Sequence, residues 1–298
     1  MQLDDQGTHY TARFGSWEEC VSFVEHAPSE VTPDQQASRL NSRERVDFCG
    51  GLTYKQTIRT ANDGWEAGAD LVNRHALKSF RAIADRIERP HYVYDVEGTD
   101  IDVARFVDGD PECWARQEQR LTEGPGRRVF RFVFAWVVSG GVSTRTIESR
   151  GAAAVALIQA MELAGHGVEV DLCYSVGAGA NCGSGASYRK VEAYVNIKKA
   201  DQPLDLPRLA FAIAHPASLR RIGFGLMERL PRPILYNFTK SKGYGNGDGL
   251  FDPLEQGDVF LGGATYDRGD WNNDAWVQKW IVDTLKAQGI ELARVGQE

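Results

Sequence analysis

The clearest change between apolar and polar positions in this chain begins at residue 129. Val129 to Val138 is an apolar run of strand length, rich in aromatic and β-branched residues. Only Arg131 interrupts the run, near its start, where we expect it to reach solvent. A run that is apolar on both faces is typical of a strand inside a parallel sheet. Gly140 and Gly141 then break the pattern, which predicts a turn after this strand.

A helix and a second strand follow this turn. Residues 148–164 carry small and aliphatic side chains at helical spacing, and Gly165 stands where a glycine commonly ends a helix. Val168 to Tyr174 is again apolar and of strand length. A strand, a helix and a parallel strand close with a right-handed crossover in nearly all proteins. The segment therefore predicts the βαβ unit of a Rossmann-like sheet.

The rest of the C-terminal half alternates between strand and helix patterns. Residues 188–198 alternate with a period of two after a glycine-rich loop, which favours an antiparallel strand at the edge of the sheet. Prolines open two helices, and an asparagine or aspartate caps a third. The expected elements are helices from Pro207 to Ala214, from Pro216 to Arg229 and from Asn273 or Asp274 to Gly289, and strands at Asp258–Leu261 and Ile290–Val295.

Residues 1–125 have a different pattern, which we interpret as an α-rich region with a β-hairpin. Ser16 and Thr53 precede helical periods and are suited to N-terminal caps. The predicted fold class is α/β: residues 126–298 form a mainly parallel, Rossmann-like sheet with an antiparallel edge strand, and residues 1–125 precede it. The expected elements of the first region are helices at Trp17–Val24, residues 54–64 and Trp65–Ile87, and a hairpin of His91–Val96 with Ile101–Val107.

The order of elements from residue 127 onward resembles that of the von Willebrand factor A-type domain. That family carries the turn DxSGS after its first strand, and Val137 to Gly141 is the matching segment here. Only Ser139 and Gly140 agree with the motif, and the family's later aspartate falls near Gly262 or Gly263. The resemblance therefore implies a degenerate domain whose missing carboxylates leave no site for Mg²⁺. We expect neither a metal nor a cofactor.

Composition places the chain among ordinary globular proteins. Its 298 residues are 42% hydrophobic and 25% charged, and no apolar run approaches the roughly 18 to 20 residues that span a bilayer. The five cysteines are scattered and form no CxxC pair, which argues against a disulfide framework or a zinc site. The polar N-terminus does not resemble a secretory signal. These features predict a cytoplasmic protein that does not insert into a membrane.

The net charge of −7 conceals an uneven distribution. Residues 208–242 hold seven basic side chains and one acidic side chain, which gives this segment a charge of +6. Tyrosines lie among them, and cations beside aromatic rings are the mixture that binds single-stranded nucleic acid. A solvated helix face is the alternative explanation. If the segment binds nucleic acid, the expected contacts are Arg220, Arg221, Arg232, Tyr236, Lys240, Lys242 and Tyr244.

The region of the predicted hairpin is acidic. Paired carboxylates can bind cations or transfer protons, but alternation along a strand points neighbouring side chains in opposite directions. We therefore interpret this cluster as a solvated surface. Its members are Asp95, Glu97, Asp100, Asp102, Asp108, Asp110 and Glu112.

The turn after the first strand and a later loop are the best candidates for a site. In open α/β sheets ligands bind at the carboxyl ends of the strands, so Ser139, Gly140 and Gly141 are expected to share a crevice with Asp267 and Asp270. No residue is singled out as catalytic. The favoured function is a metal-free binding or scaffold protein with an unidentified protein partner, of a kind found in phages or mobile elements. Nucleic-acid binding and hydrolysis in the crevice are the alternatives.

Overall fold

The computed structural model describes most of the chain. Within the described ranges no helix is both long enough and apolar enough to cross a lipid bilayer. The predictions for Arg232, Tyr236, Lys240, Lys242, Tyr244 and Asp267, and for the strand after Ile290, lie outside the described residues. Those residues are 1–32, 36–74, 91–98, 100–118, 128–177, 190–231, 234, 255–263 and 269–290.

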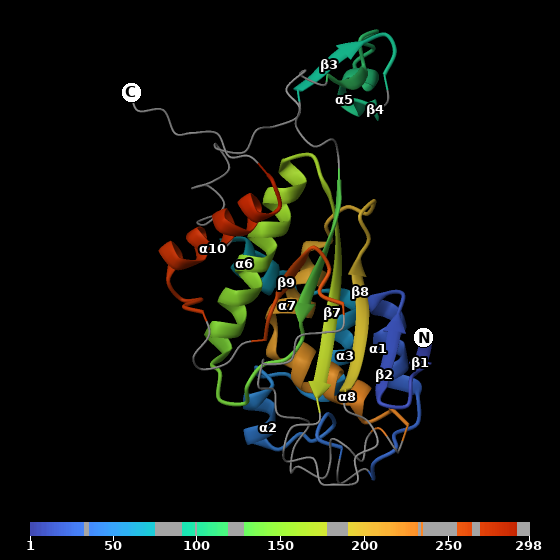
Figure 1. The fold of residues 1–298 in the computed structure, drawn as a ribbon, viewed down its shortest axis with the longest axis vertical. Helices are drawn as coiled ribbons and strands as arrows, with labels where there is room; N and C mark the ends of the chain where they lie inside the picture. Colours follow the sequence, from blue (N-terminus) through green and yellow to red (C-terminus); the bar gives the residue numbers. More distant parts are fainter. Residues whose placement is uncertain are drawn as a thin grey trace.

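A six-stranded mixed sheet forms the centre of the fold (Figure 1). In spatial order its strands are β1 (Gln2–Asp5), β2 (His9–Phe14), β8 (Lys190–Lys198), β7 (Gly167–Gly177), β6 (Val129–Ala135) and β9 (Val259–Leu261). The strand β6 pairs in parallel with both β7 and β9, and β2 pairs in parallel with β8. Antiparallel pairs join β7 to β8 and β1 to β2. The predicted α/β class and mostly parallel sheet are thus confirmed.

Helices pack against one face of this sheet and build a single large core with it. Phe130, Phe132 and Phe134 of β6 belong to this core, whereas Val133 belongs to a small cluster on the opposite face. A doubly wound sheet has helices on both faces, but in the described residues the second face carries mainly polar side chains. The helices of the core are α1 (Trp17–His26), α3 (Tyr54–Asp63), α6 (Thr144–Leu163), α7 (Leu206–Ala214), a π-helix (Ser218–Gly223), α8 (Phe224–Met227) and α10 (Asp274–Ala287).

The helix α6 is the crossover between β6 and β7 that the sequence predicts. Its N-terminal cap is Ser143, whose hydroxyl accepts a hydrogen bond from the Thr146 amide at 3.2 Å. The helix therefore begins four residues earlier than expected. Gly151 faces α7 so closely that a Cβ atom on it would lie 2.5 Å from the Cβ of Ala214. Small residues in this helix thus allow two helices to pack backbone to backbone.

The N-terminal residues are less purely helical than expected, because β1 and β2 join the central sheet. The strand β2 pairs with β8 along its whole length. As a result β8 lies inside the sheet, and the prediction that it is an edge strand is wrong. Trp17 of α1 is buried and its ring lies 6.0 Å from that of Trp136, which follows β6. The two predicted regions therefore contribute to one core.

Residues 91–118 form a small three-stranded sheet instead of the predicted hairpin. Its strands are β3 (His91–Asp95), β5 (Trp114–Glu118) and β4 (Asp100–Ile101), in that order. Residues expected in the second hairpin strand form the short helix α5 (Val103–Val107). The carboxylate of Asp102 accepts hydrogen bonds from the amides of Ala104 and Arg105 and caps this helix. A local cap thus outweighs the alternating pattern.

Candidate functional site

The carboxyl ends of β6 and β9 are held together by one buried arginine from α6. The Nη2 atom of Arg150 donates to the carbonyl oxygens of Ala135 at 2.9 Å, Leu261 at 3.2 Å and Gly262 at 2.7 Å. The side chain is 1% exposed. This arginine was not among the sequence candidates. The one feature of the sequence that could have identified it is a charged residue within the apolar stretch of a predicted helix.

The electrostatics of Arg150 are unusual because burial is not offset by a carboxylate in the described part of the chain. Burial lowers the pKa of its guanidinium to about 9. The guanidinium carbon lies 4.0 Å from the centre of the Phe134 ring, and Nε is buried without a hydrogen-bond partner. The positive charge is therefore supported by three carbonyl dipoles and one aromatic face.

The described residues at the ends of β6 and β9 do not suit a divalent cation such as Mg²⁺. Val137, in place of the first aspartate, is a buried apolar residue, as the sequence predicts. Gly141 and Gly262 contribute no side-chain oxygen. The carbonyl groups that face the strand ends already accept from Arg150. A Mg²⁺ ion needs several oxygen ligands with negative charge, and a buried guanidinium repels it.

The structure describes most of the residues that were predicted to form a crevice. The carbonyl of Ser139 accepts from the Val142 amide at 3.0 Å, so this turn leads directly into α6. Asn272 lies beside the same end of the helix, with hydrogen bonds to Thr146 at 3.1 Å and Ser149 at 3.2 Å. Gly140, Gly141 and Asp270 are exposed, and Asp267 lies outside the described residues. Asn272 thus joins the loop before α10 to the start of α6, and a shared crevice of the named residues stays a prediction.

Two of the predicted nucleic-acid contacts are buried, which corrects their assignment. Arg220 is 4% exposed and Arg221 is 0% exposed. The guanidinium of Arg220 donates to the carbonyl of Phe48 at 2.6 Å. That of Arg221 donates to the carbonyls of Leu52, Ser38 and Leu40 at 2.8–3.1 Å. They anchor residues 38–52, which include the helix α2 (Arg43–Phe48), to the core and do not form a face for phosphate. A count of charges along the sequence cannot distinguish these two environments.

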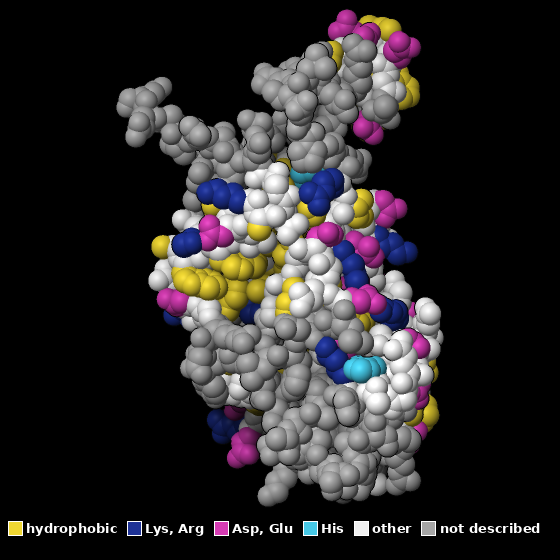
Figure 2. Space-filling view, viewed as in Figure 1, with side chains coloured by type: hydrophobic (Ala, Val, Ile, Leu, Met, Phe, Trp, Pro, Cys, Tyr) yellow, Lys and Arg dark blue, Asp and Glu magenta, His cyan; other side chains and the backbone are white. Residues whose placement is uncertain are grey.

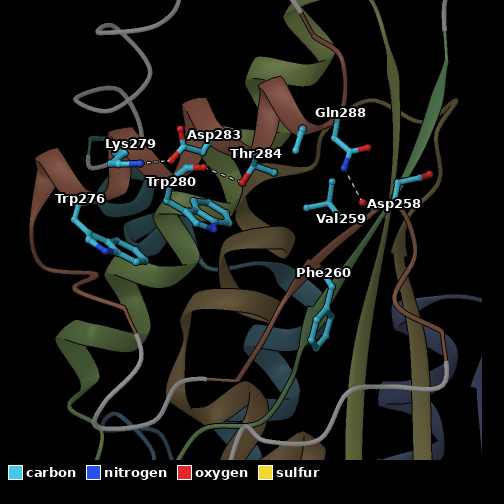
Figure 3. Close-up of a pocket in the computed structure, with 10 residues that line it drawn as sticks. Asp258, Val259, Phe260, Trp276, Lys279, Trp280, Asp283, Thr284 and Gln288 are labelled. Atoms are coloured by element: carbon cyan, nitrogen blue, oxygen red, sulfur yellow. Dashed lines mark hydrogen bonds and ion pairs between the residues drawn. The ribbon is translucent and has the colours of Figure 1, made fainter.

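A groove of about 450 Å³ lies between β9 and α10 (Figure 3). Trp276 and Trp280 project from α10, and Val259 and Phe260 lie across from them on β9. The two indoles are half-buried and pack edge-on against Trp271, with ring centres 4.8 and 5.3 Å apart. The sequence pattern places both tryptophans on an amphipathic helix without showing that they line a groove. Figure 2 shows hydrophobic side chains gathered over this part of the surface.

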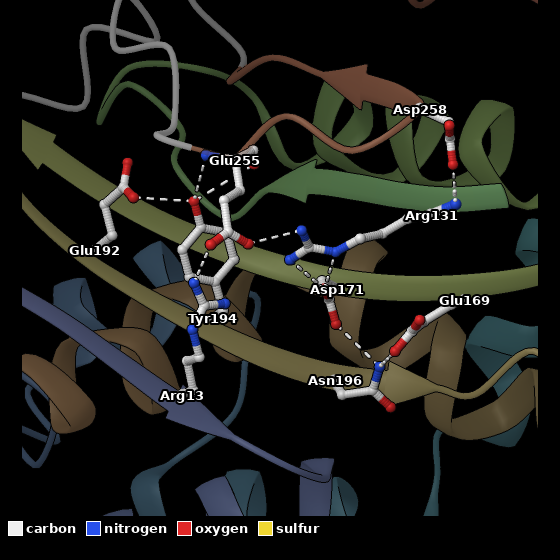
Figure 4. A network of polar contacts seen from close by, with 9 residues as sticks. All are labelled: Arg13, Arg131, Glu169, Asp171, Glu192, Tyr194, Asn196, Glu255 and Asp258. Carbon is white, nitrogen blue, oxygen red and sulfur yellow. Dashed lines mark hydrogen bonds and ion pairs between the residues drawn. The ribbon is translucent and has the colours of Figure 1, made fainter. Parts of the chain in front are cut away.

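The face of the sheet opposite the helices, which we call the open face, carries a network of charged side chains (Figure 4). The network lies beside a small buried cluster of Val133, Cys173 and Tyr194. Arg131 lies at its centre, with ion pairs of 2.8 Å to both Asp171 and Glu255. Arg13 from β2 also pairs with Glu255. Asn196 donates to Asp171 at 3.0 Å and to Glu169 at 2.9 Å. Arg131 is therefore not simply solvated, as the sequence suggested, because strands far apart in sequence supply its partners.

Mutual pairing sets the protonation of this network. Burial alone lowers the pKa of Arg131, but its hydrogen bonds to Glu255 and Asp171 raise the pKa overall. Burial alone raises the pKa of Glu255, and its two arginine partners lower it overall. Both groups are thus held in their charged forms. The described members of the network satisfy one another and do not leave an obvious acid or base for catalysis.

Comparisons with known proteins identify a family but not an activity. Residues 3–291 match the family described as a domain of unknown function (DUF7192), so the chain belongs to that family. No curated protein and no solved structure matches the chain.

Proposed function

We propose that this chain is a metal-free binding protein with a von Willebrand A-like sheet, and that its partner is a protein. If β6, β7, β8 and β9 are numbered from one to four, their spatial order is 3-2-1-4. This is the order of the first four strands in a common doubly wound sheet. The third strand is antiparallel, as in the family that the sequence resembles. The additional β1 and β2 and the open polar face are departures from that family's pattern.

The observation that carries the metal-free part of this proposal is the position of Arg150. A guanidinium that donates to carbonyl groups of Ala135, Leu261 and Gly262 supplies positive charge between the ends of β6 and β9. In the resembled family a cation binds after the corresponding strands. Arg150 is a permanent substitute that draws the same two strand ends together.

The groove between β9 and α10 supports a role in protein binding. The strand β9 is the last strand in the sheet order and pairs only with β6 among the described residues. An edge strand beside an aromatic groove can accept an extended segment of another protein, whose backbone pairs with the strand while its side chains enter the groove. Trp276 and Trp280 are residue types that contribute strongly to such interfaces.

Calorimetry with Mg²⁺ and Mn²⁺ tests the metal-free part. We expect no binding at micromolar concentrations, either to the parent chain or to Val137→Asp. The variant restores one carboxylate but leaves Arg150 in place, so its lost stability is not recovered with added Mg²⁺. Micromolar Mg²⁺ binding that Ser139→Ala abolishes contradicts the proposal.

Affinity capture from a native lysate, with and without nuclease, tests the protein-binding part. We expect a retained protein that is insensitive to nuclease and lost with Trp276→Ala. The matched control is Lys286→Ala, an exposed position on the same helix that does not line the groove. Retention that depends on nucleic acid instead favours the nucleic-acid alternative. That alternative, hydrolysis, the cytoplasmic location and the phage association all stay predictions.

A further inference from the structure

The three-stranded unit of residues 91–118 exposes an unusual share of the apolar surface. Ten large hydrophobic side chains are exposed in the described residues, and six of them lie in this short segment. A sheet of three short strands is too small to bury all its apolar residues within itself. The six are Val96, Ile101, Val103, Phe106, Val107 and Trp114.

These side chains lie on adjoining elements of the unit. Val103, Phe106 and Val107 follow the spacing i, i+3 and i+4 on α5, which places them on one face of that helix. Ile101 is the cross-strand neighbour of Trp114 in the β4–β5 pair, and it immediately precedes the cap of α5. The hydrogen bonds to Asp102 cap this helix, and Val103, Phe106 and Val107 are exposed.

The same unit carries most of the protein's net negative charge. Residues 91–118 contain eight acidic and two basic side chains, a net charge of −6 against −7 for the whole chain. Glu97, Asp100, Asp108 and Glu112 are exposed. Figure 2 shows acidic and hydrophobic side chains side by side on this unit. An apolar patch with an acidic border is typical of an interaction surface.

We propose that this acidic-apolar unit binds a basic, amphipathic segment of a protein partner. Such a segment covers the apolar face of α5 and places its cations against the surrounding carboxylates. A second copy of this chain is disfavoured, because two units of −6 repel each other. Nucleic acid is disfavoured for the same reason. This surface is distinct from the groove between β9 and α10, so the inference does not depend on the function proposed above.

The test uses the full chain and two synthetic peptides of 18 residues, one of leucine and lysine and one of leucine and glutamate, both with amphipathic helical spacing. We expect binding of the lysine peptide only. Val107→Ser should weaken the affinity for this peptide about tenfold, because an apolar contact between Val107 and the peptide is lost. Val129→Ser is the matched control, since Val129 is an exposed valine outside the unit, and it should leave the affinity unchanged.

A second variant separates the contribution of charge. Glu97→Gln, Asp108→Asn and Glu112→Gln together should lower the affinity at low salt and flatten its dependence on salt. Equal binding of both peptides, or no binding of either, overturns the proposal. Analytical ultracentrifugation tests for a second copy of this chain. A dimer that is lost in Val107→Ser would assign the patch to that second copy. A melting temperature lowered by several degrees in Val107→Ser shows that the chain's own residues cover it.

Discussion

The two faces of the six-stranded sheet are stabilised in different ways. On the helix-covered face, Phe132 and its neighbours on β6 are fully buried in one continuous core. On the open face, Arg131 forms ion pairs with Asp171 and Glu255, and its side chain is partly exposed to solvent. Burial of apolar area adds directly to stability, whereas pairing of charges largely replaces their interactions with water. The comparison suggests that the covered face supplies the stability and that the open face can change more freely.

The largest effect should come from a deletion on the covered face. Phe132→Ala removes a fully buried ring and leaves a cavity, so we expect the free energy of unfolding to fall by about 3–5 kcal/mol. Urea denaturation followed by circular dichroism measures this change. A loss below about 1 kcal/mol would show that the covered face repacks easily, which contradicts the comparison.

A buried histidine on the covered side should make stability depend on pH. His215 packs between Trp65 and Phe211, and its Nδ1 accepts a hydrogen bond from the Ala217 amide at 3.0 Å. Burial lowers its pKa to about 4. The unfolded chain binds this proton near pH 6.5 and the folded chain only near pH 4, so stability falls as the pH drops through this window.

Between pH 6.5 and pH 4 the titration of His215 should lower the free energy of unfolding by about 3 kcal/mol. Well above pH 6.5 the residue is neutral in both states and contributes nothing to the pH dependence. His215→Asn keeps an acceptor near the position of Nδ1 but does not titrate. Urea denaturation at several pH values should therefore show a shallower slope between pH 4 and 6.5 for this variant. Identical slopes for parent and variant rule out a neutral, buried histidine.

The guanidinium at the strand ends should have an intermediate effect. Arg150→Met fills similar space but leaves the carbonyls of Ala135, Leu261 and Gly262 without this donor. The variant also removes an unpaired buried charge, which offsets part of this cost. We therefore expect the free energy of unfolding to fall by about 2 kcal/mol. The melting temperature and hydrogen exchange at residues 259–263 measure it. An unchanged melting temperature would mean that the guanidinium is dispensable to the fold.

Local signals explain which parts of this fold were predictable. Ser16, Thr53 and Asn273 cap helices as expected. In each case the side-chain oxygen accepts a hydrogen bond from a backbone N–H group in the first turn of the helix. The pairing of β2 with β8 joins residues about 180 positions apart, and the sequence of neither strand indicates its partner. Hydrophobic pattern therefore predicted the βαβ unit but not the full sheet order.

The candidate site was less predictable than the fold for a related reason. Arg150 and Arg221 look like surface charges in the sequence, but both are buried against carbonyl groups from distant segments. Their environment depends on tertiary contacts that no local pattern records. The exposed apolar face of α5 was missed because Asp102 turns an alternating stretch into a helix.

The smallest effect should come from the open face, where a double-mutant cycle isolates one ion pair. Arg131→Met and Asp171→Asn remove the two partners of a 2.8 Å contact, singly and together. We expect a coupling energy of about 1 kcal/mol, because the arginine keeps Glu255 and the aspartate keeps Asn196 when the other partner is lost.

Salt provides the control for this pair. The coupling between Arg131 and Asp171 should weaken only slightly in high salt, since the carboxylate side chain is 9% exposed. The exposed helical pair Arg59–Asp63 should instead show a coupling close to zero in the same assay. A coupling above about 3 kcal/mol for Arg131 and Asp171 would place the open face on a par with the apolar core. The sheet would then depend on both faces equally, because removal of one charge would leave the other buried and unpaired.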